Sequence, residues 1–299
     1  MYLDVHAHLY KYPYPRPCST AMDARGYFEM FLNEEQLIRR HDELGIDRAV
    51  LLPLVSAEVY VPQSVGEVIE FANQSNGRFI PFCSLDPRVL DNRSDADLGF
   101  LIDFYKRQGC KGMGEVLPNM EFRDPKMQNL FHHCQQAGFP LLFDCSAYLG
   151  ESYGLYDDPG LPQLEKSLEK FPNLTFIGHG PGFWSELGAL RPGEDRRQYL
   201  HSPIEKEGAV VRLMREHKNL WVDLSAGSGY CAMTRDIDFT RRFMNEFWDR
   251  ILFGTDICFN VIPERLVIGL LNDFHADGIL SDEKFEAITH KNAERLLDI

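Results

Sequence analysis

Short apolar runs alternate with longer amphipathic stretches along the whole chain of 299 residues. This alternation is typical of repeated βα units that build a parallel sheet. Eight of the apolar runs have the length and composition of buried strands, at residues 2–5, 49–54, 79–84, 111–116, 140–145, 174–177, 220–224 and 251–253. The pattern therefore predicts an α/β fold with eight parallel strands.

An amphipathic stretch follows each predicted strand, and several end in glycine, which readily adopts the left-handed conformation of a helix C-cap. The predicted helices occupy residues 34–44, 64–76, 98–108, 126–137, 161–171, 204–217, 239–247 and 263–273, with a last helix at 282–297. The closing glycines are Gly45, Gly77, Gly109 and Gly138. This order favours a single (β/α)₈ barrel domain over residues 1–299, although a doubly wound open sheet produces the same alternation.

The composition argues against several classes of protein. A formal net charge of −14 opposes the basic surface that tracks phosphates, so we expect no nucleic-acid partner. No run approaches the roughly 18 to 20 apolar residues of a membrane span, and no secretory signal is visible. The seven scattered cysteines contain no C-x-x-C pair, which indicates free thiols in a reducing compartment. We therefore expect a cytoplasmic enzyme with a small-molecule substrate and no membrane contact, and leave a homodimer open.

The first predicted strand ends in Asp4-Val-His-Ala-His8. Residues two apart on an extended chain point to the same side, so His6 and His8 can converge on one point in a barrel mouth. Imidazole is a ligand for zinc, iron and nickel, and Asp4 could orient one of the histidines or cap the turn. A chance pair of surface histidines is the alternative, and the position at a strand end favours the metal site.

Two further strand ends carry groups with acid–base chemistry. Barrel closure would place Asp256, at the end of the eighth strand, beside His6 and His8, where it could bind a metal and accept a proton from water. A cap for the next helix is the alternative for Asp256. His179 ends the sixth strand between two glycines that would let a substrate approach the backbone, so we expect an acid–base or electrophilic role rather than a packing role.

Two more carboxylates end the fourth and fifth predicted strands. They are Glu115 and Asp144. Either could be a metal ligand, and either could form an internal salt bridge with Lys111.

Three long loops follow the first, fifth and sixth strands, at residues 10–33, 146–160 and 180–203. Such loops form the catalytic face of a barrel, so their aromatic residues, Tyr148 and Trp184 among them, are predicted walls of a substrate pocket, with loop packing as the alternative. Arginines of the last loop are candidates for bidentate binding of a substrate carboxylate, unless they are solvated. They are Arg191, Arg196 and Arg197.

These motifs and their order resemble the amidohydrolase superfamily, specifically the amidohydrolase-related family that includes aminocarboxymuconate-semialdehyde decarboxylase. The resemblance spans the chain and rests on Asp4-Val-His-Ala-His8, Gly178-His-Gly180, Gly254-Thr-Asp256 and Ile288-Thr-His-Lys-Asn-Ala-Glu-Arg-Leu-Leu297. It implies a barrel with zinc or another divalent ion held by His6, His8 and Asp256, and with His179 beside the substrate.

The chain departs from the family pattern at strand 5, where the family usually has a metal-binding histidine and this sequence has Asp144. The extra anion would favour harder ions such as manganese. Glu115 resembles the strand-4 glutamate of related branches, which serves as a ligand or bridges two metals, and for that reason we favour Glu115 as the compensating ligand. A mononuclear site with either carboxylate, a binuclear site and a metal-free site all stay open.

The resemblance implies hydrolysis of a small, carboxylated ester, lactone or amide by a metal-activated water, with Asp256 as base and His179 assisting. Hydrolysis ranks first because the superfamily is mostly hydrolytic. The same site could decarboxylate a conjugated acid, and a metal-free lactonase would use Asp256 alone as base. A non-catalytic binding barrel is the last alternative, and the presence of H-x-H, His179 and Asp256 together argues against it.

Overall fold

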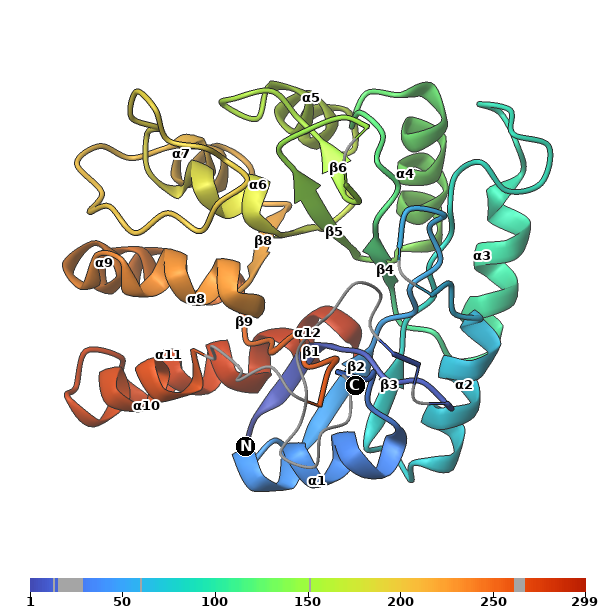
Figure 1. Cartoon of the computed structure of the whole chain (residues 1–299), viewed down its shortest axis with the longest axis horizontal. Helices are drawn as coiled ribbons and strands as arrows, with labels where there is room; N and C mark the ends of the chain where they lie inside the picture. Colours follow the sequence, from blue (N-terminus) through green and yellow to red (C-terminus); the bar gives the residue numbers. More distant parts are fainter. Residues whose placement is uncertain (13, 16–28, 60, 151, 261–266) are drawn as a thin grey trace.

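A computed structural model describes residues 1–12, 14–15, 29–59, 61–150, 152–260 and 267–299 (Figure 1). Cys18, most of the first long loop and the start of the helix predicted at 263–273 lie outside the described residues. No described helix is both long and apolar enough to cross a membrane.

All eight predicted strands are present. They are β1 (Leu3–Ala7), β2 (Arg48–Leu51), β3 (Phe79–Pro81), β4 (Met113–Val116), β5 (Leu141–Ser146), β7 (Phe176–His179), β8 (Leu220–Asp223) and β9 (Ile251–Leu252). They form two parallel sheets with the orders β1-β2-β3 and β4-β5-β7-β8-β9. The two-residue β6 (Leu155–Tyr156), which pairs with β5, was not predicted because it lies within a long loop.

Backbone hydrogen bonds connect the two sheets at both seams. The amide of Val5 donates to the carbonyl of Phe253 (3.0 Å), which places β1 beside the end of β9. The amide of Gly114 donates to the carbonyl of Cys83 (2.8 Å), which places the chain after β3 beside β4. The strands therefore follow one another around a (β/α)₈ barrel, and the open-sheet alternative is not needed.

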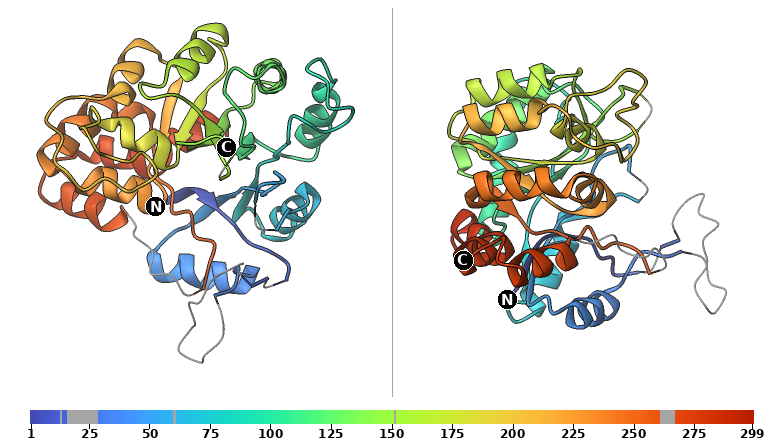
Figure 2. Two further views of the ribbon diagram at one scale, coloured as in Figure 1. Left: turned by 45° about the horizontal axis from the view of Figure 1, so that its top comes forward. Right: turned by 90° about the vertical axis from the view of Figure 1, so that its left-hand side faces the viewer.

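Helices surround the strands, as the views in Figures 1 and 2 show. The outer helices are α1 (Glu34–Leu44), α2 (Val65–Gln74), α3 (Leu98–Arg107), α4 (Pro125–Ala137), α5 (Pro162–Lys170), α7 (Ala209–Glu216), α9 (Ile237–Phe247) and α10 (Ile268–Ala276). Local capping explains the ends of α1. The side chains of Asn33 and Gln36 each accept a hydrogen bond from the other residue's backbone N–H at its start, and Gly45 ends the helix with a left-handed φ of 71°.

Helical segments at three places differ from the predictions. Two short segments in the loop after β7, α6 (Pro181–Trp184) and η1 (Ser185–Leu187), and one helix after β8, α8 (Ala226–Thr234), were missed. Their sequences are rich in glycine and serine, which lowers helix propensity. The predicted terminal helix is divided into α11 (Asp282–Glu286), the π-helical turn η3 (Ala287–Lys291) and α12 (Asn292–Leu297).

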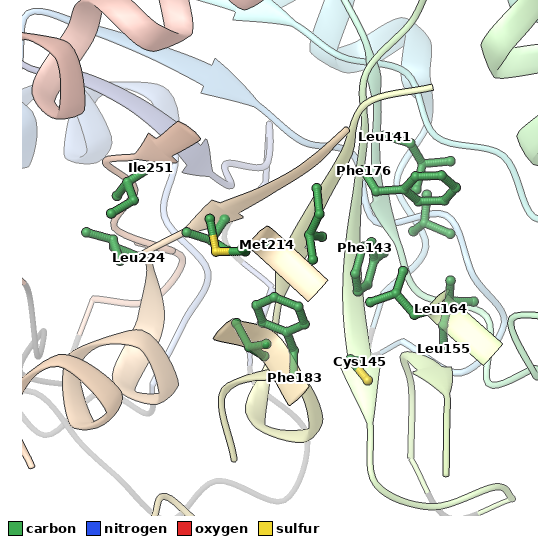
Figure 3. Close-up of a cluster of buried hydrophobic side chains, with 14 of the residues drawn as sticks. Leu141, Phe143, Cys145, Leu155, Leu164, Phe176, Phe183, Met214, Leu224 and Ile251 are labelled. Atoms are coloured by element: carbon green, nitrogen blue, oxygen red, sulfur yellow. The ribbon is translucent and has the colours of Figure 1, made fainter. Parts of the chain in front are cut away.

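Side chains along a regular strand such as β5 alternate between the barrel interior and the helical layer. On β5, Leu142 belongs to the interior layer. Leu141 and Phe143 belong to the cluster between the strands and the outer helices (Figure 3). The interior layer below the catalytic end consists of Leu3, Val5, Val50, Leu52, Ile80, Phe82, Leu142, Ile177, Trp221 and Leu252, closed by Ala293 and Leu297 of α12. This layer supports the polar residues at the strand ends.

Replacement of Leu252 by alanine should destabilise the barrel by about 2 to 5 kcal/mol, because the side chain is fully buried and the interior cannot collapse into the space it leaves. Urea unfolding measures the effect. The control Leu90→Ala, at a side chain 59% exposed, should change the free energy of unfolding by less than about 0.5 kcal/mol. Equal losses in the two variants would contradict the placement of Leu252.

Candidate active site

Four predicted metal ligands converge at the carboxyl end of the barrel. His6 and His8 come from the end of β1, Glu115 from β4, and Asp256 from the segment after β9. The Nε2 atoms of the two histidines lie 3.1 Å apart. Oε2 of Glu115 lies 3.4 and 3.5 Å from them, and Oδ1 of Asp256 lies 3.6 and 3.3 Å from them. The structure thus brings these four together, and their role as ligands stays a prediction.

The spacing of these donor atoms fits a small divalent ion. A zinc ion about 2.0 to 2.1 Å from four tetrahedral ligands requires ligand atoms about 3.3 to 3.4 Å apart. The separations given above run from 3.1 to 3.6 Å. Two imidazole nitrogens and two carboxylate oxygens also form a donor set that zinc and manganese both accept.

Hydrogen bonds at the far nitrogens fix the direction of both imidazoles. Nδ1 of His8 donates to the carbonyl of Leu52 (2.8 Å), and Nδ1 of His6 faces Oδ2 of Asp223 (2.7 Å). With Nδ1 engaged, each ring presents Nε2 to the centre. A register shift in β1 between Asp4 and Ala7 helps, because it allows the consecutive residues Val5 and His6 both to face the barrel interior.

Asp223 at the end of β8 is a site residue that the sequence reasoning missed. It is fully buried, and its Oδ2 contacts His6, Nδ1 of His179 (3.3 Å) and the hydroxyl of Ser225 (2.6 Å). Ser225 in turn lies 3.0 Å from Nδ1 of His179. The signal was available, because Asp223 is a carboxylate at the end of a predicted strand, as Glu115 is.

Asp4 connects the strand that carries the histidines to the segment that carries Asp256. Its buried carboxylate accepts hydrogen bonds from the amides of His6 and Thr255 (2.9 Å each) and from the Thr255 hydroxyl. Asp4 therefore orients backbone rather than a ligand imidazole. Asp256 has a left-handed φ of 57°, and its amide donates to the carbonyl of His6 (2.7 Å).

The helix-cap alternative for Asp256 does not fit its surroundings. The next residue, Ile257, forms a parallel bridge with Ala7 instead of beginning a helix. The carboxylate of Asp256 faces the two histidines.

Asp144 lies apart from the four converging groups, with Oδ2 4.0 Å from Nε2 of His179. A Cβ atom at Gly154 or Gly180 would approach its carboxylate to 2.3 or 2.8 Å. The missing side chain at Gly180 makes room for Asp144, and the predicted approach of a substrate to this backbone is untested. Gly178 likewise makes room for the ring of Phe183.

The structure does not favour the alternative of a salt bridge between Lys111 and either strand-end carboxylate. Its ammonium group donates to the backbone carbonyl of Asp298 (3.1 Å) near the end of the chain. Glu115 and Asp144 therefore face the barrel mouth without a lysine partner.

The two carboxyl groups differ in their pKa. Burial raises the pKa of Glu115, but the charges and hydrogen bonds of His6 and His8 outweigh burial and lower it overall. Burial and the negative charge of Glu115 raise the pKa of Asp144 to about 8. For His8, hydrogen bonds with Asp256 and Glu115 outweigh burial and raise the pKa to about 9. The four converging groups thus attract positive charge, and Asp144 is largely neutral at pH 7.

Trp184 and Arg196 have partners within the protein, and their predicted contact with a substrate is untested. Trp184 is buried, and its indole N–H donates to the carbonyl of Asp223 (3.2 Å), so it supports the site from behind. Arg196 is also buried, and its Nε pairs with Oε1 of Glu186 at 3.0 Å.

The other three predicted contacts lie on the loops that follow β5 and β7. Arg191 pairs with Glu205 (3.2 Å). Arg197 pairs with Asp195 (2.7 Å) and lies 4.4 Å from the ring of Tyr148. Each of these arginines therefore has an acceptor in its own loop, and their predicted contact with a substrate is untested.

Comparison with known proteins places this geometry in a family. The family model described as Amidohydrolase matches residues 3–299. No curated protein matches the chain significantly.

Solved structures share the fold. An amidohydrolase from Burkholderia multivorans with bound zinc has a TM-score of 0.64 at 12% identity, covering 100% of this chain and 99% of that one. A probable 2-pyrone-4,6-dicarboxylic acid hydrolase from Acinetobacter baumannii has a TM-score of 0.57 at 15% identity, covering 100% of this chain and 99% of that one. An uncharacterised TIM-barrel protein from Bordetella bronchiseptica has a TM-score of 0.61 at 17% identity, covering 89% of this chain and 83% of that one.

The stability of the metal-free protein should fall as the pH rises from 6.5 to 9. Protonated His8 stabilises the fold, and this contribution is complete below its unfolded pKa of about 6.5 and disappears as the pH passes its folded pKa of about 9. The contribution of His8 to this loss should be roughly 1 to 3 kcal/mol, so the slope should be smaller in His8→Asn, where His6, whose pKa is also raised, still contributes; urea unfolding after chelator dialysis can show this. The exposed control His201→Asn should keep the wild-type slope. An unchanged slope in His8→Asn would refute this assignment.

Proposed function

Because this chain belongs to the amidohydrolase family, we propose that it is a hydrolase that depends on a divalent metal, zinc first and manganese second, and acts on a small carboxylated cyclic ester. The observation that carries the proposal is the donor set at the barrel mouth. The two imidazole nitrogens lie 3.1 Å apart, and each carboxylate oxygen lies 3.3 to 3.6 Å from both of them, which is a spacing that donor atoms around one small divalent ion have.

His6, His8, Glu115 and Asp256 would hold the ion. A bound divalent ion that keeps a further position open beside these four side chains would lower the pKa of a water held there and polarise the carbonyl under attack. Among the four side chains, that of Asp256 is 27% exposed, whereas the others are 6% exposed or less. Asp256 is therefore the carboxylate that water and substrate can reach, and we assign it the role of general base.

His179 is held for a role beside the substrate. Its Nδ1 is engaged by Asp223 and Ser225, which leaves Nε2 to face the barrel mouth. From there it can donate a hydrogen bond to the oxyanion that develops on the carbonyl oxygen. Asp144, whose Oδ2 lies 4.0 Å from Nε2 of His179, borders the same side of the site.

The substrate class draws on two of the structural neighbours. The structures from Acinetobacter baumannii and Pseudomonas putida are named as probable or putative 2-pyrone-4,6-dicarboxylic acid hydrolases. A pyrone is a cyclic ester, which accords with a hydrolytic site of this kind. We therefore propose a carboxylated lactone as the substrate class, and 2-pyrone-4,6-dicarboxylic acid as the first compound to assay.

The two strand-end carboxylates should differ in their importance for metal binding. Glu115→Gln should weaken zinc affinity by about tenfold or more, because it removes an anionic group that faces both histidines. Asp144→Asn is the matched control and should keep the wild-type affinity, since Asp144 contacts neither His6 nor His8 among the described contacts. Competition for zinc with a chromogenic chelator measures the affinity of each variant. Loss of zinc from Asp144→Asn alone would reverse the assignment.

Replacement of Asp256 by asparagine should lower kcat by about 100-fold or more and leave the melting temperature nearly unchanged. The amide keeps the shape of the side chain but cannot accept the proton. Steady-state hydrolysis of 2-pyrone-4,6-dicarboxylic acid, with equal metal content verified in both proteins, provides the comparison. If kcat stayed within a few-fold of the wild type, Asp256 would not be the base.

A further inference from the structure

A narrow cavity lies between α6 and α8, beside the candidate active site. It contains about 200 Å³ of space between protein atoms, part of which is open to solvent. Trp184 and Ser185 line one side, Ser228 and Arg235 line the other, and Gln198 belongs to the loop that borders it. Because Ser228 and Arg235 are seven residues apart at helical spacing, they lie on the same face at α8.

Three polar atoms around this cavity are buried without a hydrogen-bond partner among the described residues. They are Nε and Nη2 of Arg235 and Oγ of Ser228. Ser228 is only 4% exposed. Burial of a polar group without a partner is costly, and a guanidinium with two unpaired N–H donors is more costly still. Such groups indicate a ligand that accepts hydrogen bonds.

The acidic residues near Arg235 already accept hydrogen bonds from other donors. Glu194 accepts from the amide of Arg191 (2.8 Å) and from the Ser202 hydroxyl. Asp236 accepts from the amide of Phe239 (3.0 Å) with one oxygen and from that of Ile204 (3.0 Å) with the other. The charges of Glu194, Asp236 and Arg191 all act on Arg235, but none of these groups pairs with its buried nitrogens.

The cavity lies between two segments that follow residues of the catalytic cluster along the chain. Pro181, which also lines it, follows His179 by two residues. On the other side, α8 begins directly after Ser225, whose hydroxyl contacts Nδ1 of His179. Both walls of the cavity therefore start from residues in or beside the catalytic cluster.

We propose that Arg235 and Ser228 form a subsite for one carboxylate group of the substrate. The planar guanidinium would bind the carboxylate through Nε and Nη2, and the Ser228 hydroxyl would donate a third hydrogen bond. This inference rests on the proposed function for the identity of the ligand. It assigns carboxylate recognition to Arg235, whereas Arg191, Arg196 and Arg197 each have an acceptor of their own.

Calorimetric titration of the whole protein with sodium acetate, at constant ionic strength and without added metal, tests the subsite directly. Arg235→Met and Ser228→Ala should each weaken acetate binding, the first by about tenfold or more. Arg241→Met is the control for loss of one positive charge, because Arg241 is exposed and pairs with Asp238 on its own helix. Ser228→Ala removes a single buried oxygen and is expected to fold even if Arg235→Met does not.

The source of the carboxylate is tested by steady-state kinetics with 2-pyrone-4,6-dicarboxylic acid. A raised KM in Arg235→Met with kcat nearly unchanged would support the substrate subsite. Loss of acetate binding without any change in KM would overturn it and identify a site for a free anion. Absence of acetate binding to the wild type, or equal binding to all variants, would overturn the subsite whether or not the protein hydrolyses esters, since this readout needs neither metal nor turnover.

Discussion

The hydrogen bonds that hold β1 beside the segment after β9 are the constraint on which the site depends. Asp4 accepts from the amides of His6 and Thr255, and the amide of Asp256 donates to the carbonyl of His6. These bonds close the barrel seam and, in the same place, set the carboxylate of Asp256 against the two imidazoles. Without barrel closure, no backbone hydrogen bonds would bring Asp256, near the end of the chain, beside His6 and His8 near its start.

Charge is the second property that follows from this closure. Buried imidazoles and carboxyl groups gather in a small space, and the carboxylates raise the pKa of both His6 and His8 in spite of burial. Without a bound cation, the positive charges of protonated His6 and His8 compensate the negative charges of the carboxylates. A divalent ion would compensate these negative charges in place of the protons on the histidines. Because those protons would be released on binding, rising pH should favour metal binding at this site. Asp223 holds His6 and His179 from behind in either state.

The alternation of apolar runs was sufficient to predict all eight strands, and the bounds of α1 were predicted to the residue. Strand-end position selected His6, His8, Glu115, Asp144 and Asp256, because the carboxyl ends of barrel strands meet at one face, and only the family resemblance favoured Glu115 over Asp144. The loops could not be treated in this way. Arg196 looked available for a substrate in the sequence, but its partner Glu186 comes close only through tertiary packing. Trp184 was missed as a buried support of Asp223 for the same reason.

Anomalous diffraction from crystals of the zinc-loaded protein, recorded on both sides of the zinc absorption edge, tests the central claim most directly. The account predicts one strong peak within about 2.0 to 2.2 Å of Nε2 of His6, Nε2 of His8 and the carboxylate oxygens of Glu115 and Asp256. A peak bound by Asp144 and His179 instead, or no peak between the two histidines at full zinc loading, would contradict it.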